Sequence, residues 1–163
     1  MKLAISFLLL LLSSGNLLWC NQHLKNGDYQ FFVVTKVVDG DTFWIDDGSE
    51  KGLKIRLIGI DAPESRKSRN KAIGAFGKES KAFATKLLLN KKVRLEFDVG
   101  RYDRFKRTLA YVYLEDGSFV NLILIKEGYA TVMTVPPNVK YADLFLKLQR
   151  EAMKKQKGLW KEN

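Results

Sequence analysis

The sequence has very little of the two side chains that most often bind transition metals or transfer protons. It contains one histidine, His23, and one cysteine, Cys20, both near the amino terminus. Hydrolysis that uses a histidine base or a histidine-rich zinc site is therefore excluded for the rest of the chain. A single cysteine also excludes a disulfide within the chain. Any hydrolytic chemistry must depend on carboxylates, arginines and a hard cation that prefers oxygen ligands.

Long apolar runs are also scarce. The run Leu3 to Leu12 is too short to span a bilayer comfortably, and small residues follow it. This pattern predicts a signal peptide over residues 1–19 and a secreted or periplasmic protein; a retained anchor is the alternative. Lipidation of Cys20 is less favoured, because the preceding Trp19 is not the small residue that a lipoprotein processing site needs.

Acidic residues are fewer than basic ones. The 163 residues include 28 lysines and arginines against 18 acids, a formal net charge of +10. Such a balance favours a polyanionic partner, either nucleic acid or an acidic membrane surface. The hydrophobic content of 46% is that of a globular protein. We expect a flexible arm over residues 20–29 and one domain over residues 30–163.

Alternating and β-branched segments predict five strands, and amphipathic segments predict three helices. The expected strands cover residues 30–38, 42–45, 51–60, 93–97 and 109–114. The expected helices cover residues 80–90, a segment capped by Ser118 and closed by Gly128, and residues 141–152. Five short strands with a helix before the fourth predict an α+β fold, a five-stranded OB-fold β-barrel carrying about three helices.

Two acidic turns follow expected strands. The first is Asp39-Gly40-Asp41-Thr42 and the second is Asp61-Ala62-Pro63-Glu64. Either turn alone is typical of a solvated loop. A barrel can, however, bring two strand ends to one rim, and a group of carboxylates there would favour Ca²⁺ or Mg²⁺.

Two arginines strengthen that interpretation. Arg56 lies in the apolar segment 54–58, where a guanidinium without a partner is unfavourable, although it could also extend to solvent at a strand edge. Arg107 opens the next apolar strand and raises the same question. Arginines beside carboxylates are typical of metal-assisted phosphodiester cleavage, because guanidiniums and a cation neutralise charge on the phosphorane.

These residues, in this order, resemble the staphylococcal nuclease (thermonuclease) family, and a secreted member of it. The resemblance spans Phe31 to about Trp160 and implies the same five-stranded OB-fold. The matching motifs are Val38–Thr42, Arg56–Leu57, Asp61–Glu64, Asp103–Tyr113, Val120–Asn121, Gly128 and Gly158–Trp160.

The resemblance implies a calcium-dependent endonuclease with one Ca²⁺ ion. Asp41, Asp61 and the backbone carbonyl of Ala62 would hold the ion, and Glu64 would position or deprotonate the attacking water. The reaction would break the 5′-oxygen–phosphorus bond of DNA or RNA and leave 3′-phosphate ends.

The resemblance also implies that Arg56 and Arg107 are catalytic, because they would bind the phosphate and stabilise the transition state. DNA and RNA would be the partners, with single-stranded or flexible regions favoured, and the protein would act as a monomer. Phe105 and the segment 131–135 lack tyrosines that line the family's nucleotide pocket, and Lys106 replaces a glycine.

A basic segment after Glu64 could guide the nucleic-acid backbone, although a solvated loop explains it equally well. The expected nucleic-acid contacts are Arg66, Lys67, Arg69, Lys71 and Arg104. The alternative function is a non-catalytic OB-fold protein that binds single-stranded nucleic acid. A basic surface-anchored adhesin explains none of the acid–arginine pattern.

Overall fold

The computed structural model describes residues 29–65 and 76–161. The expected signal peptide, nearly all of the expected arm, and four of the expected nucleic-acid contacts lie outside these residues. Those four contacts are Arg66, Lys67, Arg69 and Lys71. Within the described residues, no helix is long and apolar enough to cross a membrane.

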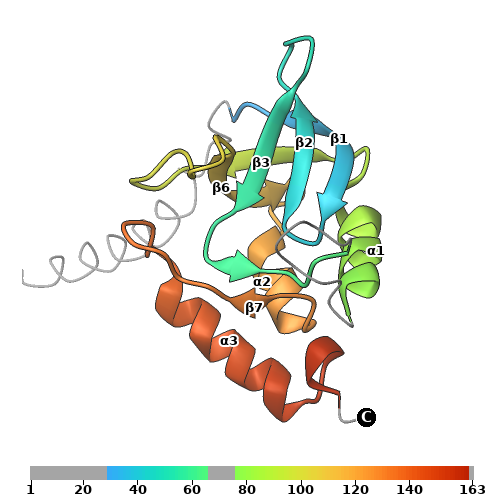
Figure 1. Ribbon diagram of the computed structural model, residues 1–163, viewed down its shortest axis with the longest axis vertical. Helices are drawn as coiled ribbons and strands as arrows, with labels where there is room; N and C mark the ends of the chain where they lie inside the picture. Colours follow the sequence, from blue (N-terminus) through green and yellow to red (C-terminus); the bar gives the residue numbers. More distant parts are fainter. Residues whose placement is uncertain (1–28, 66–75, 162–163) are drawn as a thin grey trace, which may run out of the picture.

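Five strands form a closed barrel in the order β1-β2-β3-β6-β5 (Figure 1). The strands are β1 (Phe32–Asp39), β2 (Thr42–Asp46), β3 (Leu53–Leu57), β5 (Lys92–Glu96) and β6 (Thr108–Leu114). All neighbouring pairs are antiparallel except β3 and β6, which run parallel. The expected five-stranded barrel is confirmed.

The interior of the barrel is filled by β-branched and other apolar side chains. Val34, Ile45, Ile55, Val93 and Val112, one from each strand, are fully buried. Burial of each such side chain contributes about 1.5–3 kcal/mol. The core therefore fixes the strand register, because a slip of one residue would turn these side chains outward.

The expected strand over residues 51–60 is wrong in one respect, because the structure divides it in two. β3 ends at Leu57, and Gly59 has a φ of +78°. A Cβ atom on Gly59 would lie 2.6 Å from the Phe145 ring, so the close packing of that ring also requires glycine. The chain then turns into β4 (Ile60–Asp61), which pairs with β7 (Thr131–Val132) outside the barrel.

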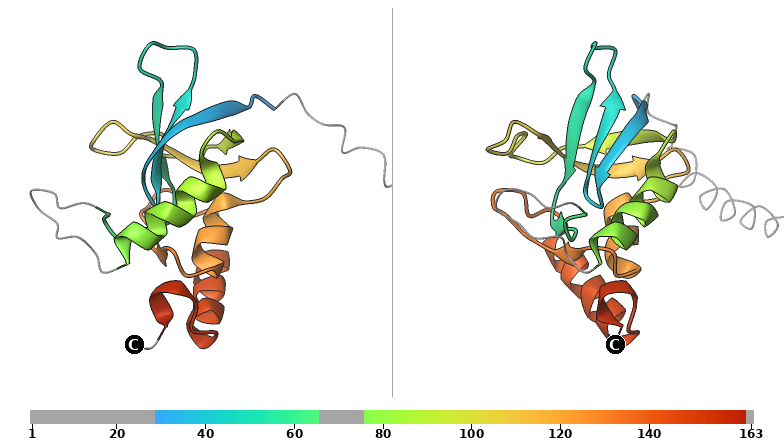
Figure 2. Two further views of the ribbon diagram at one scale, coloured as in Figure 1. Left: turned by 90° about the vertical axis from the view of Figure 1, so that its right-hand side faces the viewer. Right: turned by 45° about the vertical axis from the view of Figure 1, so that its right-hand side comes forward.

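In the described part of the chain, three helices pack around the barrel, as the sequence predicts. They are α1 (Gly77–Leu88), α2 (Val120–Lys126) and α3 (Ala142–Lys154), and one 3₁₀ turn (Gly158–Trp160) follows. α1 lies against β1, whereas α2 and α3 pack on each other below the barrel (Figure 2).

Most helix boundaries differ from expectation by one to three residues, whereas the end of α2 at Gly128 is confirmed. α1 begins three residues earlier than expected, at Gly77, which has no side chain and packs directly against the backbone of Glu64 and Ser65. Ser118 does not cap α2, since the N-cap residue is Phe119 and no side chain caps this helix end. Gly128, with a φ of +73°, closes α2 as expected.

Candidate active site

The strand register places Arg56 at the centre of the candidate site. In the β2–β3 pair, Thr42 lies opposite Arg56, so Asp41 lies just beyond the start of β2 and beside it. In the parallel β3–β6 pair, Arg56 lies opposite Leu109, two residues after Arg107. Residues from three distant segments therefore meet at one end of the barrel.

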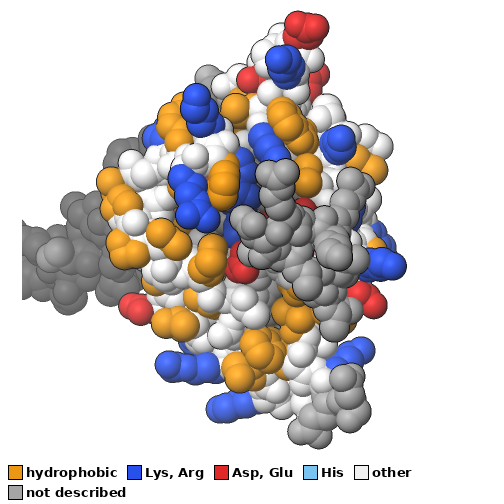
Figure 3. All heavy atoms as spheres, in the orientation of Figure 1, with side chains coloured by type: hydrophobic (Ala, Val, Ile, Leu, Met, Phe, Trp, Pro, Cys, Tyr) orange, Lys and Arg blue, Asp and Glu red, His pale blue; other side chains and the backbone are white. Residues whose placement is uncertain are grey.

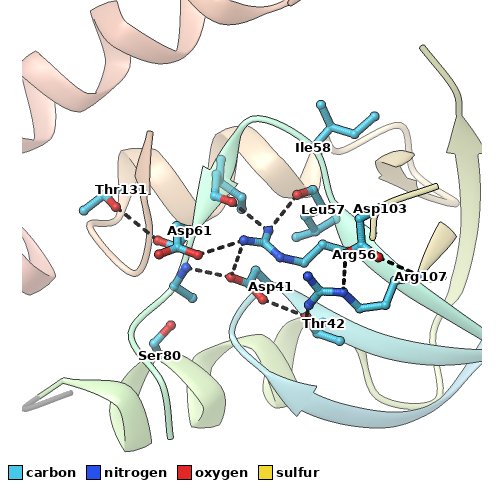
Figure 4. A network of polar contacts seen from close by, with 12 residues as sticks. Asp41, Thr42, Arg56, Leu57, Ile58, Asp61, Ser80, Asp103, Arg107 and Thr131 are labelled. Carbon is cyan, nitrogen blue, oxygen red and sulfur yellow. Dashed lines mark hydrogen bonds and ion pairs between the residues drawn. The ribbon is translucent and has the colours of Figure 1, made fainter. Parts of the chain in front are cut away.

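Arg56 joins the two acidic turns. Its Nη2 lies 2.8 Å from Oδ1 of Asp61 and 3.2 Å from Oδ2 of Asp41. Its Nη1 donates to the carbonyl oxygens of Leu57 at 2.8 Å and Ile60 at 2.7 Å, both on the turn that follows β3. Figure 4 shows the guanidinium between the two aspartates. The buried arginine thus has its partners, and the alternative of an arginine that extends to solvent is wrong for Arg56.

Asp41 is buried and makes several hydrogen bonds. Its Oδ2 accepts the backbone N–H of Ala62 at 2.7 Å, and its Oδ1 accepts the Thr42 hydroxyl at 2.8 Å. Burial raises the pKa of Asp41 above its ordinary value, although Arg56 and both of these hydrogen bonds favour the charged form. An added cation would therefore lower this pKa, because positive charge stabilises the carboxylate.

Arg107 is held by a different contact. Its Nε donates to Oδ2 of Asp103 at 2.6 Å, and the Arg107 backbone N–H donates to the other carboxylate oxygen at 3.0 Å. Burial acts to raise the pKa of Asp103, but the hydrogen bonds from Arg107 outweigh it and the pKa lies below its ordinary value. Nη1 of Arg107 lies 3.4 Å from Oγ1 of Thr42, which links this arginine to Asp41.

Glu64 lies in a turn whose backbone is fixed on both sides. Asp39 accepts hydrogen bonds from the amide and from the hydroxyl of Ser65, the next residue. Gly77, the first residue of α1, packs so closely that a Cβ there would lie 2.0 Å from the Glu64 carbonyl oxygen. The backbone of Glu64 is therefore held between the first acidic turn and α1.

Two carboxylates of the site have the ligand type and charge that a hard divalent cation prefers. Asp41 and Asp61 supply oxygen donors and share one guanidinium, so a negative charge remains between them. No three His, Cys, Asp or Glu side chains of residues 29–65 and 76–161 converge as a metal-binding group. Three acidic side chains therefore do not meet at one point, and the Ala62 carbonyl as third protein ligand stays a prediction.

Among the expected nucleic-acid contacts, Arg104 is described. It is exposed, and its guanidinium lies 4.7 Å from the centre of the Phe105 ring. Arg107 lies 5.5 Å from the same ring, and Phe105 itself is 64% exposed. Figure 3 shows lysine and arginine side chains spread over this face of the molecule, with hydrophobic side chains between them. A basic and aromatic surface thus borders the site.

Comparison with known proteins agrees with this geometry. Residues 54–162 match the family described as staphylococcal nuclease homologue. The chain belongs to the staphylococcal nuclease family. The thermonuclease of Staphylococcus intermedius is 45% identical over 130 residues, covering 79% of this chain and 75% of that protein. The thermonuclease of Staphylococcus hyicus is 42% identical over 138 residues, covering 84% of this chain and 79% of that protein.

A more distant relative extends the comparison. The SPbeta prophage-derived endonuclease YokF of Bacillus subtilis is 38% identical over 133 residues. These residues cover 80% of this chain and 44% of YokF. The family therefore includes proteins larger than this chain, and the match lies within the part that they share.

Sequence reasoning did not assign a role to several residues that position the site in this nuclease-family chain. They are Asp39, Thr42, Ser65, Asp103 and Thr131. Asp103 and Arg107 lie four residues apart in the sequence, and this spacing of opposite charges could have predicted their ion pair. The Asp39–Ser65 contact, across 26 residues, has no local signal.

Proposed function

We propose that the protein is a calcium-dependent endonuclease that hydrolyses DNA and RNA and leaves 3′-phosphate ends. The observation that carries the proposal is the contact of one buried arginine with both acidic turns. Family membership and two thermonuclease relatives support a nuclease. The oxygen-only ligands and the excess negative charge between Asp41 and Asp61 support calcium.

Each group has a role in this proposal. Asp41, Asp61 and the Ala62 carbonyl would hold the ion, which when bound supplies positive charge to a non-bridging phosphate oxygen. Glu64 accepts a proton from the attacking water. The water oxygen then bonds to phosphorus, the bond to the 5′-oxygen breaks, and the leaving oxygen takes a proton from solvent water.

The two arginines stabilise the phosphorane. Four acceptor atoms hold the guanidinium of Arg56 in place. Its positive charge is therefore positioned before substrate binds. Arg107 is more exposed; Asp103 holds its Nε, its Nη1 lies 3.4 Å from the Thr42 hydroxyl, and we infer that the end of its guanidinium binds the phosphate. Favourable charge is therefore already in place where negative charge develops.

Further proposals concern secretion, oligomeric state and the preferred form of the substrate. We propose that residues 1–19 direct the chain to secretion and that the folded domain acts as a monomer. Single-stranded or flexible nucleic acid is the favoured substrate, because a strand that is not paired can bring its phosphate close to Arg56 and Asp41.

The test is digestion of end-labelled single-stranded DNA and RNA over a calcium titration, with end-group analysis of the products. We expect cleavage that rises with calcium, stops with a chelator and yields 3′-phosphates. A Glu64→Gln variant, matched in size, should lose activity by orders of magnitude while the domain stays folded. Binding of DNA with no cleavage at any calcium concentration would favour the non-catalytic alternative, and equal activity with chelator would contradict the metal.

A further inference from the structure

A shallow, open groove bordered by lysines runs along α1. In the left view of Figure 2 this helix faces the viewer. Three of the six residues that line the groove are lysines, and none is acidic. The lining residues are Ser65, Lys78, Lys81, Ala82, Thr85 and Lys86.

The spacing of the lining residues places them on one face of α1. Positions 78, 81, 82, 85 and 86 repeat at intervals of three and four, so they form one continuous row on the helix. The opposite face is buried, through Gly77, Ser80, Ala84 and Leu88. From Lys78 to Lys86 the row covers about 12 Å at 1.5 Å per residue.

The groove begins at the candidate active site. Ser65 lines it and is bonded to Asp39, and Ser65 directly follows Glu64. Gly77, one residue before Lys78, packs against the backbone of Glu64 and Ser65. A strand bound at Glu64 is therefore close to Ser65 and to the first turn of α1.

The chemistry of the groove suits phosphate groups. The Thr85 hydroxyl donates back to the Lys81 carbonyl at 2.8 Å, so the three lysines supply the cationic groups beside a lining that is mostly apolar. Ammonium groups bind phosphate as point charges and do not read bases. The groove therefore has a preference for a polyanionic backbone and none for a base sequence.

We propose that the α1 groove, lined by Lys78, Lys81 and Lys86, is a binding site for the backbone of single-stranded nucleic acid that extends the cleavage site. This inference rests on the proposed nuclease function. It adds a preference for long strands over short ones, because only a strand of several nucleotides reaches both Glu64 and Lys86.

Binding is tested first, separately from cleavage. Fluorescence anisotropy of labelled single-stranded DNA is measured in chelator over a salt titration, for the full chain and for a Lys78→Gln/Lys81→Gln/Lys86→Gln variant. With about 0.7 counterions released per phosphate contact, the slope of log affinity against log salt should become shallower by about 2. A control with the exposed α3-side lysines changed, Lys147→Gln/Lys154→Gln/Lys155→Gln, should keep the original slope.

Cleavage then separates the two proposals. The α1 variant should show a KM raised about tenfold on long strands at low salt, with unchanged kcat, while cleavage of a dinucleotide-sized substrate stays normal. If the unaltered chain cleaves nothing with calcium, the nuclease proposal fails. If it cleaves but both triple variants bind long DNA with the same salt slope, the groove proposal fails. Binding of the same α1 variant to anionic lipid vesicles is measured in parallel. If the variant loses binding to the vesicles but keeps its binding to DNA, the groove proposal is also overturned.

Discussion

Arg56 and Arg107 are assigned related roles at the same phosphate, yet the structure holds them in opposite ways. The side chain of Arg56 is 7% exposed and contacts two carboxylates and two backbone carbonyls. The side chain of Arg107 is 24% exposed, and within the described part of the chain Asp103 is the one carboxylate that it contacts. Arg56 therefore stabilises the fold and also forms the candidate site, whereas Arg107 contributes mainly to the candidate site.

The sharpest test of this comparison is removal of Arg56. Arg56→Ala leaves two neighbouring carboxylates, one of them buried, without their cation, so the free energy of unfolding should fall by about 3–5 kcal/mol. Urea denaturation in chelator measures the change. Arg107→Ala is the matched control and should lose about 1 kcal/mol or less. Equal losses for the two variants would show that burial does not distinguish the arginines.

The second prediction concerns the rate. Arg107→Ala should lower kcat by about 10²–10³, as removal of one transition-state donor does, because under the proposed mechanism its guanidinium binds the reacting phosphate. Single-turnover cleavage with saturating calcium measures it, with circular dichroism as the check on folding. A near-normal rate would show that Arg107 does not contact the reacting phosphate.

The third prediction tests what positions Arg107. Asp103→Asn removes the charge opposite Nε but keeps the size of the side chain, so kcat should fall by up to about 100-fold, less than for Arg107→Ala. Combining the two substitutions should add little to Arg107→Ala alone, because Asp103 acts through that arginine. Fully additive losses would indicate a separate role for Asp103.

The fourth prediction follows from the pKa of Asp103, which hydrogen bonds from Arg107 hold below the ordinary value. A carboxyl whose pKa is lowered by folding stabilises the fold above its unfolded pKa, and this stability is lost as pH falls through the folded pKa. Below about pH 4 the wild-type chain should therefore lose more stability than Asp103→Asn. Thermal unfolding at a series of pH values measures the difference, and parallel curves would contradict it.

The sequence indicated the chemistry of this site better than its geometry. Arg56 was identifiable because a guanidinium in an apolar strand needs partners, and the acidic turns supplied candidates. The end of β3 was not identifiable, because it depends on Gly59 packing against Phe145, far along the chain. The Asp39–Ser65 contact likewise arises only when the barrel brings its strand ends together.

The smallest expected effect concerns the loop before Arg107. Lys106 has a φ of +59°, which is unfavourable for a residue with a Cβ by about 1–2 kcal/mol. Lys106→Gly should therefore stabilise the fold by up to about 1 kcal/mol, since greater freedom of the unfolded chain offsets part of the gain. Arg104→Gly in the same loop, where φ is not positive, should give no gain. A gain from both variants would point to lost charge repulsion.

The parallel pairing of β3 with β6 determines when, during folding, the candidate site is assembled. Arg56 and Arg107 come together only when Ile55 pairs with Thr108, across more than fifty residues of chain. A growing or incompletely folded polypeptide has the individual acids and arginines but no assembled site. Under the proposed function, such a chain would not cleave nucleic acid until the barrel has closed.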